Sequence, residues 1–261
     1  MVKVLKNHYS DVTLLVTHYN RSASLQRLLD SFVNNDVSFG AIVVSDDGSK
    51  EEHLEYIESL SQSYNITLVK TISNKGLGNN INKGQDAVKT DYTLYVQEDF
   101  IALGLFNETF SNAVDILKAN SVIDTIRFYS YLNYPKLKAF GKGFAEMIFE
   151  HSSLNIDKIP MYSDHPHLRR KNFFDKFGRY QEGVKGDQTE YRMMLSFLKN
   201  KGRGLLHINY KSVFDQVNTN TEPSTMTRKT LTNSDNYFVQ QALYIYRLFK
   251  FIYSYYIKPI K

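Results

Sequence analysis

Short apolar runs alternate with helical patterns along the first hundred residues, and this alternation most narrows the folds open to the chain. Four runs rich in Val, Ile, Leu and Tyr are expected to be strands buried on both faces of a parallel sheet, and they span residues 11–17, 41–45, 66–70 and 92–97. A helix that Ser22 can cap follows the first strand, with an apolar stripe formed by Leu25, Leu28, Leu29, Phe32 and Val33. This order predicts an α/β, Rossmann-like, mostly parallel sheet flanked by helices.

Two of these strands end in adjacent carboxylates. AIVVSDDGS (41–49) ends in Asp46-Asp47, and LYVQEDF (94–100) contains Glu98-Asp99. The carboxyl ends of parallel strands meet at one edge of a sheet, where open α/β sheets bind ligands. We therefore expect Asp47 and Asp99 at one rim, with Asp46 as a turn or helix-capping carboxylate. A plain strand-to-helix turn is the alternative for DDGS.

Beyond residue 100 the alternation is less regular. The elements expected there are a helix at 105–120, a strand at 122–129, a turn between strands in KAFGKGF (138–144), a helix at 186–200 and a strand at 205–209. Residues 219–235 are rich in Thr, Asn, Ser and Pro and are interpreted as a linker.

Composition places the chain among folded proteins of a reducing compartment. It has 261 residues and no cysteine, which excludes disulfides and Cys-based metal sites, and its first residues do not resemble a signal peptide. We therefore expect a cytoplasmic location. The formal charge is +5, but from residue 201 onward nine Lys and Arg stand against three acidic residues, so the basic character belongs to the tail. Without a basic face tied to a known motif, nucleic acid is not expected as a partner.

Residues 236–261 read as an amphipathic, aromatic and basic helical extension. Four basic residues interrupt its apolar run, whereas a membrane-spanning helix needs about 20 predominantly apolar residues. An interfacial helix on the inner membrane surface is the better fit, because Tyr and Phe settle at headgroup level and Lys and Arg attract anionic lipid. A helix docked on the protein's own core, or on a second subunit of a homodimer, is the alternative.

Four sequence pieces in this order resemble the family 2 glycosyltransferases of the GT-A fold, which move a sugar from a nucleotide diphosphate sugar to an acceptor. The matching pieces are VTHYNR (16–21), VVSDDGS (43–49), NKGLGNNINKGQDAVKTDY (74–92) and QEDF (97–100). The resemblance is good over residues 11–100, looser to about 215 and absent in the tail. It implies a catalytic domain at 1–218, made of a nucleotide-binding half (1–100) and an acceptor-binding half (101–218), followed by the linker and the helix.

The resemblance also assigns a donor site. Asp47 would accept a hydrogen bond from the imide of a uracil base, and the segment 74–84 would close over the nucleotide, although an ordinary Gly/Asn loop is the alternative there. The residues assigned to the donor are Thr17, Tyr19, Asn20, Arg21, Asp47, Asn74, Gly76, Asn80, Lys83 and Glu98.

Glu98-Asp99 stands in the place of the family's D-x-D element. By resemblance, Asp99 holds Mg²⁺ or Mn²⁺, which bridges the two phosphates, and Glu98 holds the ribose or a metal-bound water. A late metal ligand from Asp215 is a further, weaker hypothesis.

An inverting transfer also needs a carboxylate that takes the proton of the acceptor hydroxyl. GDQTEY (186–191) matches the family's G-E-D-x-[DE]-[FY] except that Asp187-Gln188 replaces Glu-Asp. Because glutamine cannot act as a base, Asp187 is the first candidate and Glu190 the second, at i and i+3 on one side of a helix. A merely capping Asp187 is the alternative.

The segment SDHPHLRRKNF (163–173) is expected to be an extended loop near that helix. Arg169 or Arg170 could clamp an anion there. Its two histidines are expected to bond backbone or solvent rather than a metal.

The leading hypothesis is an inverting, metal-dependent glycosyltransferase that uses a UDP sugar and a glycan or lipid-linked acceptor in surface polysaccharide synthesis. One alternative is a sugar nucleotidyltransferase, which would carry a Gly-rich, basic loop where this chain has Tyr19-Asn20-Arg21. Another is a glycosyltransferase-like subunit that binds nucleotide or a partner without catalysis, as Gln188 and Glu98 would allow.

Overall fold

The computed structural model describes residues 6–150, 161–223 and 237–257. Within these ranges a mixed sheet of nine strands crosses the molecule, and β5 (Phe100–Ala102) pairs separately with β11 (Phe214–Gln216). In spatial order the nine strands are β3 (Ile66–Lys70), β2 (Val37–Asp46), β1 (Asn7–His18), β4 (Tyr92–Gln97), β9 (His167–Arg170), β6 (Thr125–Arg127), β10 (Gly204–His207), β8 (Phe144–Met147) and β7 (Leu137–Gly141).

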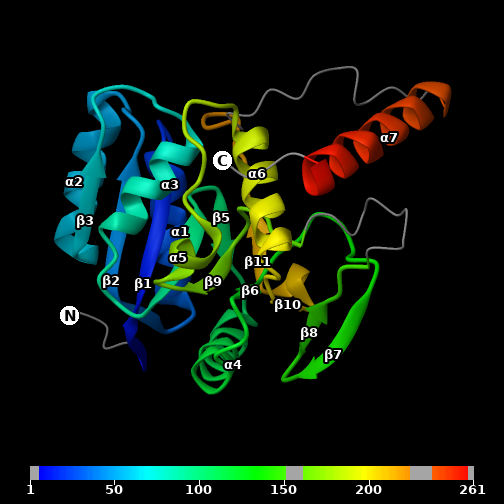
Figure 1. Ribbon diagram of the computed structural model, residues 1–261. Helices are drawn as coiled ribbons and strands as arrows, with labels where there is room; N and C mark the ends of the chain where they lie inside the picture. The colour runs from blue at the N-terminus through cyan, green and yellow to red at the C-terminus, as the bar shows by residue number, and fades with distance from the viewer. Residues whose placement is uncertain (1–5, 151–160, 224–236, 258–261) are drawn as a thin grey trace.

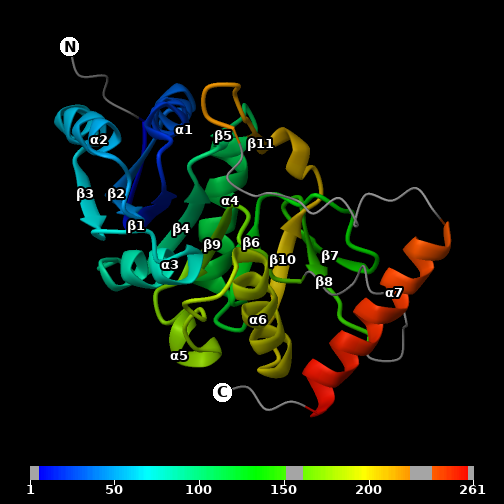
Figure 2. The same cartoon turned by 90° about the horizontal axis from the view of Figure 1, so that it is seen from above.

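Helices cover both faces of this sheet (Figures 1 and 2). These helices are α1 (Ser22–Asn34), α2 (Glu51–Tyr64), α3 (Leu77–Asp86), α4 (Phe106–Ala119), α5 (Phe173–Phe177) and α6 (Gly186–Lys199). The last helix, α7 (Tyr237–Ile252), lies at the side of the molecule, away from the sheet (Figures 1 and 2). Successive side chains of a strand point to opposite faces, and β1 shows the result: Leu14 and Val16 pack in a core with α1, α2 and α4, whereas Leu15 packs in a second core with α3, α5 and α6. Residues 12–18 of β1 are therefore buried on both faces of the sheet.

The fold class predicted from the sequence is confirmed. The strands β3 and β4 have the predicted bounds, while β1 and β2 extend beyond theirs. The KAFGKGF segment does turn between two strands, β7 and β8, with Lys142 and Gly143 at positive φ. The strand predicted at 122–129 is shorter, because β6 covers only Thr125–Arg127. The Ser22 cap is wrong: helix α1 begins after Arg21 without a side-chain cap from the flanking residue, and the Ser22 hydroxyl contacts His53 instead.

The sequence prediction missed the strand β9. It lies between β4 and β6 and is antiparallel to both, where an extended loop was expected. Its basic residues do not clamp an anion, because the Arg170 guanidinium donates to the carbonyls of Leu117 and Asn120. Arg169 is fully buried and donates to Gln85 Oε1 at 2.9 Å. Further partners of the same guanidinium are the hydroxyls of Tyr162 and Tyr180.

The C-terminal helix is anchored at its far end. Phe251 is buried, and its ring lies near those of Phe149 and Tyr255. Five residues in a π-helical turn, Tyr253–Ile257, follow α7. Among the described residues, no helix has the length and apolarity needed to cross a membrane.

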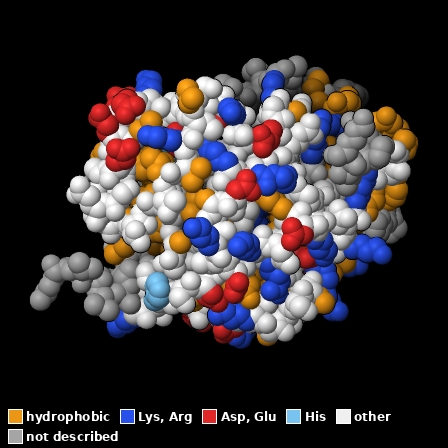
Figure 3. All heavy atoms as spheres, turned by 60° about the vertical axis from the view of Figure 1, so that its left-hand side comes forward, with side chains coloured by type: hydrophobic (Ala, Val, Ile, Leu, Met, Phe, Trp, Pro, Cys, Tyr) orange, Lys and Arg blue, Asp and Glu red, His pale blue; other side chains and the backbone are white. Residues whose placement is uncertain are grey.

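Acidic and basic side chains are mixed over the face that carries α2 and β3 (Figure 3).

The boundary predicted at residue 218 moves. Residues 219–223 pack on the domain, since Glu222 is buried and bonds to the start of α1. The rest of the predicted linker, 224–235, lies outside the described residues.

Replacing Arg169 by lysine tests whether a planar guanidinium holds β9 in the sheet. A lysine ammonium cannot reach Gln85 and the two tyrosine hydroxyls together, so we expect Arg169→Lys to lower the free energy of unfolding by about 2 kcal/mol in urea titrations. The matched control is Arg179→Lys, whose exposed ion pair with Asp86 should cost less than about 0.5 kcal/mol. Equal losses in the two variants would contradict this role of Arg169.

Candidate active site

Three neighbouring strands end at one rim of the sheet. Thr17 of β1 pairs with Ser45 of β2 on one side and with Gln97 of β4 on the other. The residues that follow these strands therefore emerge at the same level. They line one cavity of about 1070 Å³, which also reaches helix α6.

Most of the predicted site residues line this cavity. They are Thr17, Tyr19, Arg21, Asp47, Asn74, Gly76, Asn80, Glu98, Asp99, Asp187 and Glu190. Asn20 and Lys83 do not line it, which corrects the donor-binding role predicted for each. The Asn20 side chain accepts the Lys50 N–H at 2.8 Å, and the Lys83 ammonium donates to the Asp46 carbonyl. Asn20 thus links the segment after β1 to residue 50, and Lys83 links α3 to the end of β2.

The two aspartates of DDGS have different tasks. Asp46 is fully buried and holds the turn, accepting bonds from the main chain of Gly48 and Ser49 and from His18 Nδ1 at 2.8 Å. Burial alone would raise the pKa of Asp46, but the bonds from His18 and Ser49 outweigh it and lower that pKa. The His18 ring is occupied on both sides, since its Nε2 accepts the Arg21 N–H.

Asp47 joins the rim to the loop before α3. Its two oxygens accept the N–H groups of Lys75 at 2.8 Å and Gly76 at 2.9 Å. Gly76 has φ +87°, a backbone conformation that favours glycine. Burial raises the pKa of Asp47, and these two bonds oppose the rise. A base imide would therefore meet a carboxylate that is already oriented by the loop.

Arg21 balances the carboxylates at the end of β4. Its Nη1 lies 3.5 Å from Glu98 Oε1 and 3.3 Å from Asp99 Oδ2, with both side chains largely buried. Burial raises the pKa of Glu98 to about 8, the charge of Asp99 adds to the rise, and Arg21 opposes it. Additional negative charge at this rim thus needs a further cation.

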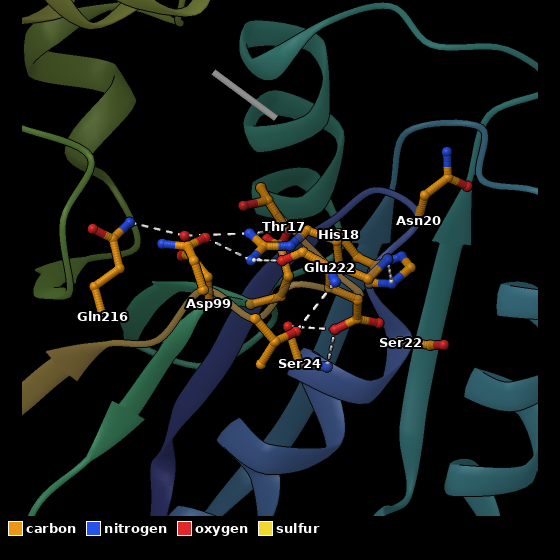
Figure 4. A network of polar contacts seen from close by, with 12 residues as sticks. Thr17, His18, Asn20, Ser22, Ser24, Asp99, Gln216 and Glu222 are labelled. Atoms are coloured by element: carbon orange, nitrogen blue, oxygen red, sulfur yellow. Dashed lines mark hydrogen bonds and ion pairs between the residues drawn. The ribbon is translucent and has the colours of Figure 1, made fainter. Parts of the chain in front are cut away.

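A late segment of the chain lies over the rim, and the sequence prediction missed it. Figure 4 shows Gln216 of this segment pointing toward Asp99 and Glu222 lying beside Ser24. Gln216 donates to Asp99 Oδ2 at 2.8 Å, and Asn218 accepts from Arg21 Nη2 at 2.8 Å. The structure does not support Asp215 as a metal ligand: the side chains of β11 alternate, so Asp215 is exposed, and its neighbour Gln216 faces the cavity.

Glu222 fixes this segment to the first helix of the chain. Its carboxylate accepts the N–H groups of Ala23 at 3.0 Å and Ser24 at 2.7 Å, which are free donors at the start of α1. We call residues 216–222 the strap. The strap joins the end of the domain to the rim formed by its first hundred residues.

The carboxylates at the rim suit a hard cation. Asp99 Oδ1 is buried and has no hydrogen-bond partner, as expected for an oxygen that binds an ion or a ligand. Among the described residues, no group of three or more His, Asp or Glu could hold a metal by itself. A cation here would therefore take Asp99, with Glu98 nearby, and complete its shell with oxygens of a bound diphosphate.

The opposite wall of the cavity carries the candidate bases. Asp187 is exposed in the first turn of α6, and its Oδ1 accepts the Gln188 N–H. Glu190 is half-buried, and its Oε1 accepts the Asp164 N–H at 3.0 Å. Burial raises the pKa of Glu190, and the charge of Asp187 adds to the rise. Asp164 also lines the cavity, and it belongs to the segment 163–173 that was expected near this helix, although no role was predicted for it. The buried Arg127 lines the cavity as well and was missed, because it stands in no recognisable motif.

Comparison with known proteins identifies the family of the chain. The model described as Glycosyl transferase family 2 matches residues 13–178, more than half of the chain. The chain therefore belongs to glycosyl transferase family 2.

Curated relatives match over shorter stretches. An uncharacterized glycosyltransferase of Haemophilus influenzae is 28% identical over 88 residues, which cover 34% of this chain and 29% of that protein. The cholesterol galactosyltransferase of Borreliella burgdorferi is 26% identical over 125 residues, which cover 48% of this chain and 34% of that protein. The chain thus spans about a third of the length of the curated relatives it matches.

A solved structure agrees over most of the chain. The crystal structure of S. aureus TarS 1–349 in complex with UDP-GlcNAc superposes with a TM-score of 0.61 at 14% identity, covering 94% of this chain and 73% of that one. At this identity the likeness concerns the fold.

Replacing Glu222 by glutamine tests the strap. The variant loses the negative charge at the start of α1, so we expect the free energy of unfolding at pH 7 to fall by about 1–2 kcal/mol. Burial would raise the pKa of Glu222, but the bonds from Ser24 and Ala23 outweigh it and lower that pKa.

The contribution of Glu222 to the free energy of unfolding should depend on pH. Since the folded-state pKa of Glu222 is lowered, its contribution is present above the unfolded value of about 4.3 and is lost as the pH falls through the folded value. Urea titrations should therefore separate wild type from Glu222→Gln at neutral pH and bring them together in acid. Glu55→Gln, an exposed change on α2, should match wild type at every pH. A constant difference between Glu222→Gln and wild type would contradict the charge effect.

Proposed function

We propose that this protein transfers a sugar from a nucleotide diphosphate sugar, with UDP as the nucleotide, to a hydroxyl of an acceptor with inversion at the anomeric carbon. One observation carries the proposal: a single cavity joins Asp47 and Asp99, at the ends of two parallel strands, to Asp187 and Glu190 across from them. Such a cavity is large enough for a sugar nucleotide together with the reacting end of an acceptor.

The nucleotide would lie along the rim. Its base would meet Asp47 and the Tyr19 ring, its ribose would lie near Glu98, and its diphosphate would lie between Arg21 and the loop at Gly76. The choice of UDP is supported by the carboxylate of Asp47, which accepts from an imide N–H and would repel the ring acceptor that cytosine presents there. The crystallised TarS complex with UDP-GlcNAc supports the same choice.

We also propose that Mn²⁺ or Mg²⁺ binds with the donor. When bound, the ion would neutralise the charge that develops on the departing diphosphate. Asp99 Oδ1, which has no hydrogen-bond partner, and the nearby carboxylate of Glu98 would hold it. Arg21 would orient Asp99 Oδ2 and supply a fixed positive charge at the same end of the cavity.

Glu190 is our proposed base, ahead of Asp187. The acceptor oxygen forms a bond to the anomeric carbon while the bond from that carbon to the diphosphate oxygen breaks, and the electron pair of the broken bond leaves with the diphosphate. The acceptor proton passes to Glu190. A half-buried carboxylate with a raised pKa suits this task better than the exposed Asp187, which bonds to its own helix.

The acceptor would enter past aromatic residues at the cavity mouth. Tyr131 and Leu132 are about half exposed, and the Tyr131 ring lies edge-to-face with His165, 4.4 Å between centroids. Aromatic rings and aliphatic groups bind the apolar faces of sugars and lipids. We propose a glycan or lipid-linked acceptor, with surface polysaccharide synthesis as the setting.

Two alternatives from the sequence predict different results. A sugar nucleotidyltransferase would need a nucleoside triphosphate and a basic, Gly-rich loop after β1, where the chain has Tyr19, Asn20 and Arg21. A subunit without catalysis would bind nucleotide but turn nothing over.

The experiment separates the two walls of the cavity. Calorimetry with UDP, GDP and CDP, with and without Mn²⁺, is expected to give Mn²⁺-dependent binding of UDP that Asp99→Asn weakens. Glu190→Gln should keep this binding and lower kcat for sugar transfer, or for hydrolysis of the donor, about 10²–10⁴-fold. Asp175→Asn, an exposed carboxylate on α5, is the control and should match wild type. Failure to bind any nucleotide would exclude the enzyme, and UDP binding without turnover of any sugar nucleotide would favour the subunit without catalysis.

We further propose that α7 holds the enzyme on an anionic membrane surface at the cytoplasmic side. Exposed apolar side chains run along α7 and the turn after it, namely Ile245, Tyr246, Phe249, Tyr253, Tyr256 and Ile257. Arg247 and Lys250 are the charged residues of this segment, 237–257, which contains no Asp or Glu. Aromatic rings with cations and without acidic residues match an anionic headgroup layer.

Flotation with liposomes tests this surface. Phe249→Ala with Tyr253→Ala should lower the fraction bound to phosphatidylglycerol vesicles, and Arg247→Gln should weaken binding roughly fivefold, as expected for about 1 kcal/mol per cation. Val122→Ala, another exposed apolar residue, is the control and should not change binding. A chain that does not float, but forms dimers that Phe249→Ala dissociates, would show that this surface is a subunit contact instead.

A further inference from the structure

A buried carboxyl group lies beside the proposed base and has no role in the mechanism so far. Asp164 lines the cavity but is only 3% exposed. Its Oδ1 accepts the Tyr180 hydroxyl at 3.0 Å, whereas Oδ2 is buried without a hydrogen-bond partner. Its main-chain N–H is bonded to Glu190 Oε1 at 3.0 Å. The two carboxyl groups are thus neighbours in a poorly hydrated wall.

No ion pair neutralises Asp164 within the described part of the chain. Arg127 lies nearby but donates to Ser163 Oγ at 2.6 Å, and Arg169 donates to Gln85 and the tyrosines. A buried carboxylate that is neither paired nor fully hydrogen-bonded is costly, and such a group usually takes up a proton. The charged and titratable groups around it are Glu190 of α6, Arg127 of β6, Arg169 of β9, Tyr95 of β4, Tyr162 and Tyr180.

We propose that Asp164 is a positioning residue that keeps the proton of this carboxyl pair on Oδ2, so that the single negative charge of the pair lies on Glu190. The bond from the Asp164 main chain would orient that charged group. The inference rests on the proposed transfer reaction only for its kinetic consequence. When Glu190 takes the acceptor proton, both carboxyl groups are neutral until Glu190 releases its proton to water.

The electrostatics agree with this division. Burial raises the pKa of Asp164 well above its usual range, the charge of Glu190 adds to the rise, and the bond from Tyr180 with the charges of Arg169 and Arg127 opposes it. Burial also raises the pKa of Glu190, but this carboxylate is only half-buried and accepts the Asp164 N–H, whereas Asp164 Oδ2 is buried without a partner. Rising pH should therefore ionise Glu190 first and Asp164 later, and the second ionisation would place two negative charges side by side.

Infrared difference spectra report whether a carboxyl group is protonated, and they need no turnover of a substrate. Burial raises the pKa of Glu98 to about 8, so Glu98 gives a carbonyl band of its own and the spectra are compared in a Glu98→Gln background. At neutral pH this background should show the carbonyl band of a further protonated carboxylic acid, which added Asp164→Asn removes and the added control Asp175→Asn retains. Glu190→Gln removes the neighbouring charge and should make this band disappear at a lower pH than in Glu98→Gln alone. Absence of the band from Glu98→Gln, or its persistence after Asp164→Asn is added to Glu98→Gln, would overturn the proposal. Should Asp164→Asn not fold, the shift in Glu190→Gln decides, and an unchanged midpoint there would overturn it.

Kinetics give the second test. Asparagine imitates a neutral aspartic acid that cannot ionise, so the alkaline limb of the kcat/KM profile that ionisation of Asp164 would cause should be absent from Asp164→Asn. A loss beyond about 100-fold with unchanged UDP binding would mean that a charged Asp164 is needed, which contradicts the proposal. An unchanged alkaline limb would contradict it as well. If no sugar nucleotide is turned over, the proposed function fails. The infrared result still decides whether Asp164 carries the proton of the carboxyl pair.

Discussion

The parallel pairing of β1 with β2 and with β4 is the constraint on which the rest of the site depends. Thr17 stands level with Ser45 on one side and Gln97 on the other, so all three strands end together. A shift of either pairing by one residue would turn the side chains of that strand to the opposite face. Two dry cores, one on each face of β1, hold the register. The rim is therefore as rigid as the sheet.

This rigidity allows the rim to concentrate negative charge. Asp47, Glu98 and Asp99 are all largely buried, and such carboxylates are tolerated only when donors or cations face them. The main chain at residues 75–76 satisfies Asp47, while Arg21 lies against Glu98 and Asp99. Asp99 Oδ1 still lacks a partner, and this free oxygen is the basis of the cation site proposed above.

The second wall of the cavity follows a different principle. There, burial and a neighbouring carboxyl group raise the pKa values of Asp164 and Glu190 together, and no ion pair with Asp164 offsets it within the described residues. At the rim, Arg21 faces Glu98 and Asp99 and opposes the rise that burial causes in the pKa of Glu98, whereas in the opposite wall no ion pair holds Asp164 within the described residues. One cavity offers both environments, which is what a transfer that expels a diphosphate and removes a proton requires.

The sequence by itself determined the four strands of the first hundred residues, the helix after the first strand, and the placement of Asp47 and Asp99 at one rim. Continuous apolar runs, helical stripes and the common edge of parallel strands are local signals, and they located Ile66–Lys70 and Tyr92–Gln97 to the residue. Only the tertiary structure decided that HLRR forms the central strand β9. Its buried Arg169 donates a hydrogen bond to Gln85, which is distant along the chain. It also decided that Asn218 of the strap accepts a hydrogen bond from Arg21 and that the Asp164 main chain donates one to Glu190. Such contacts join residues far apart in sequence, and no spacing within either segment encodes the partner that will face it.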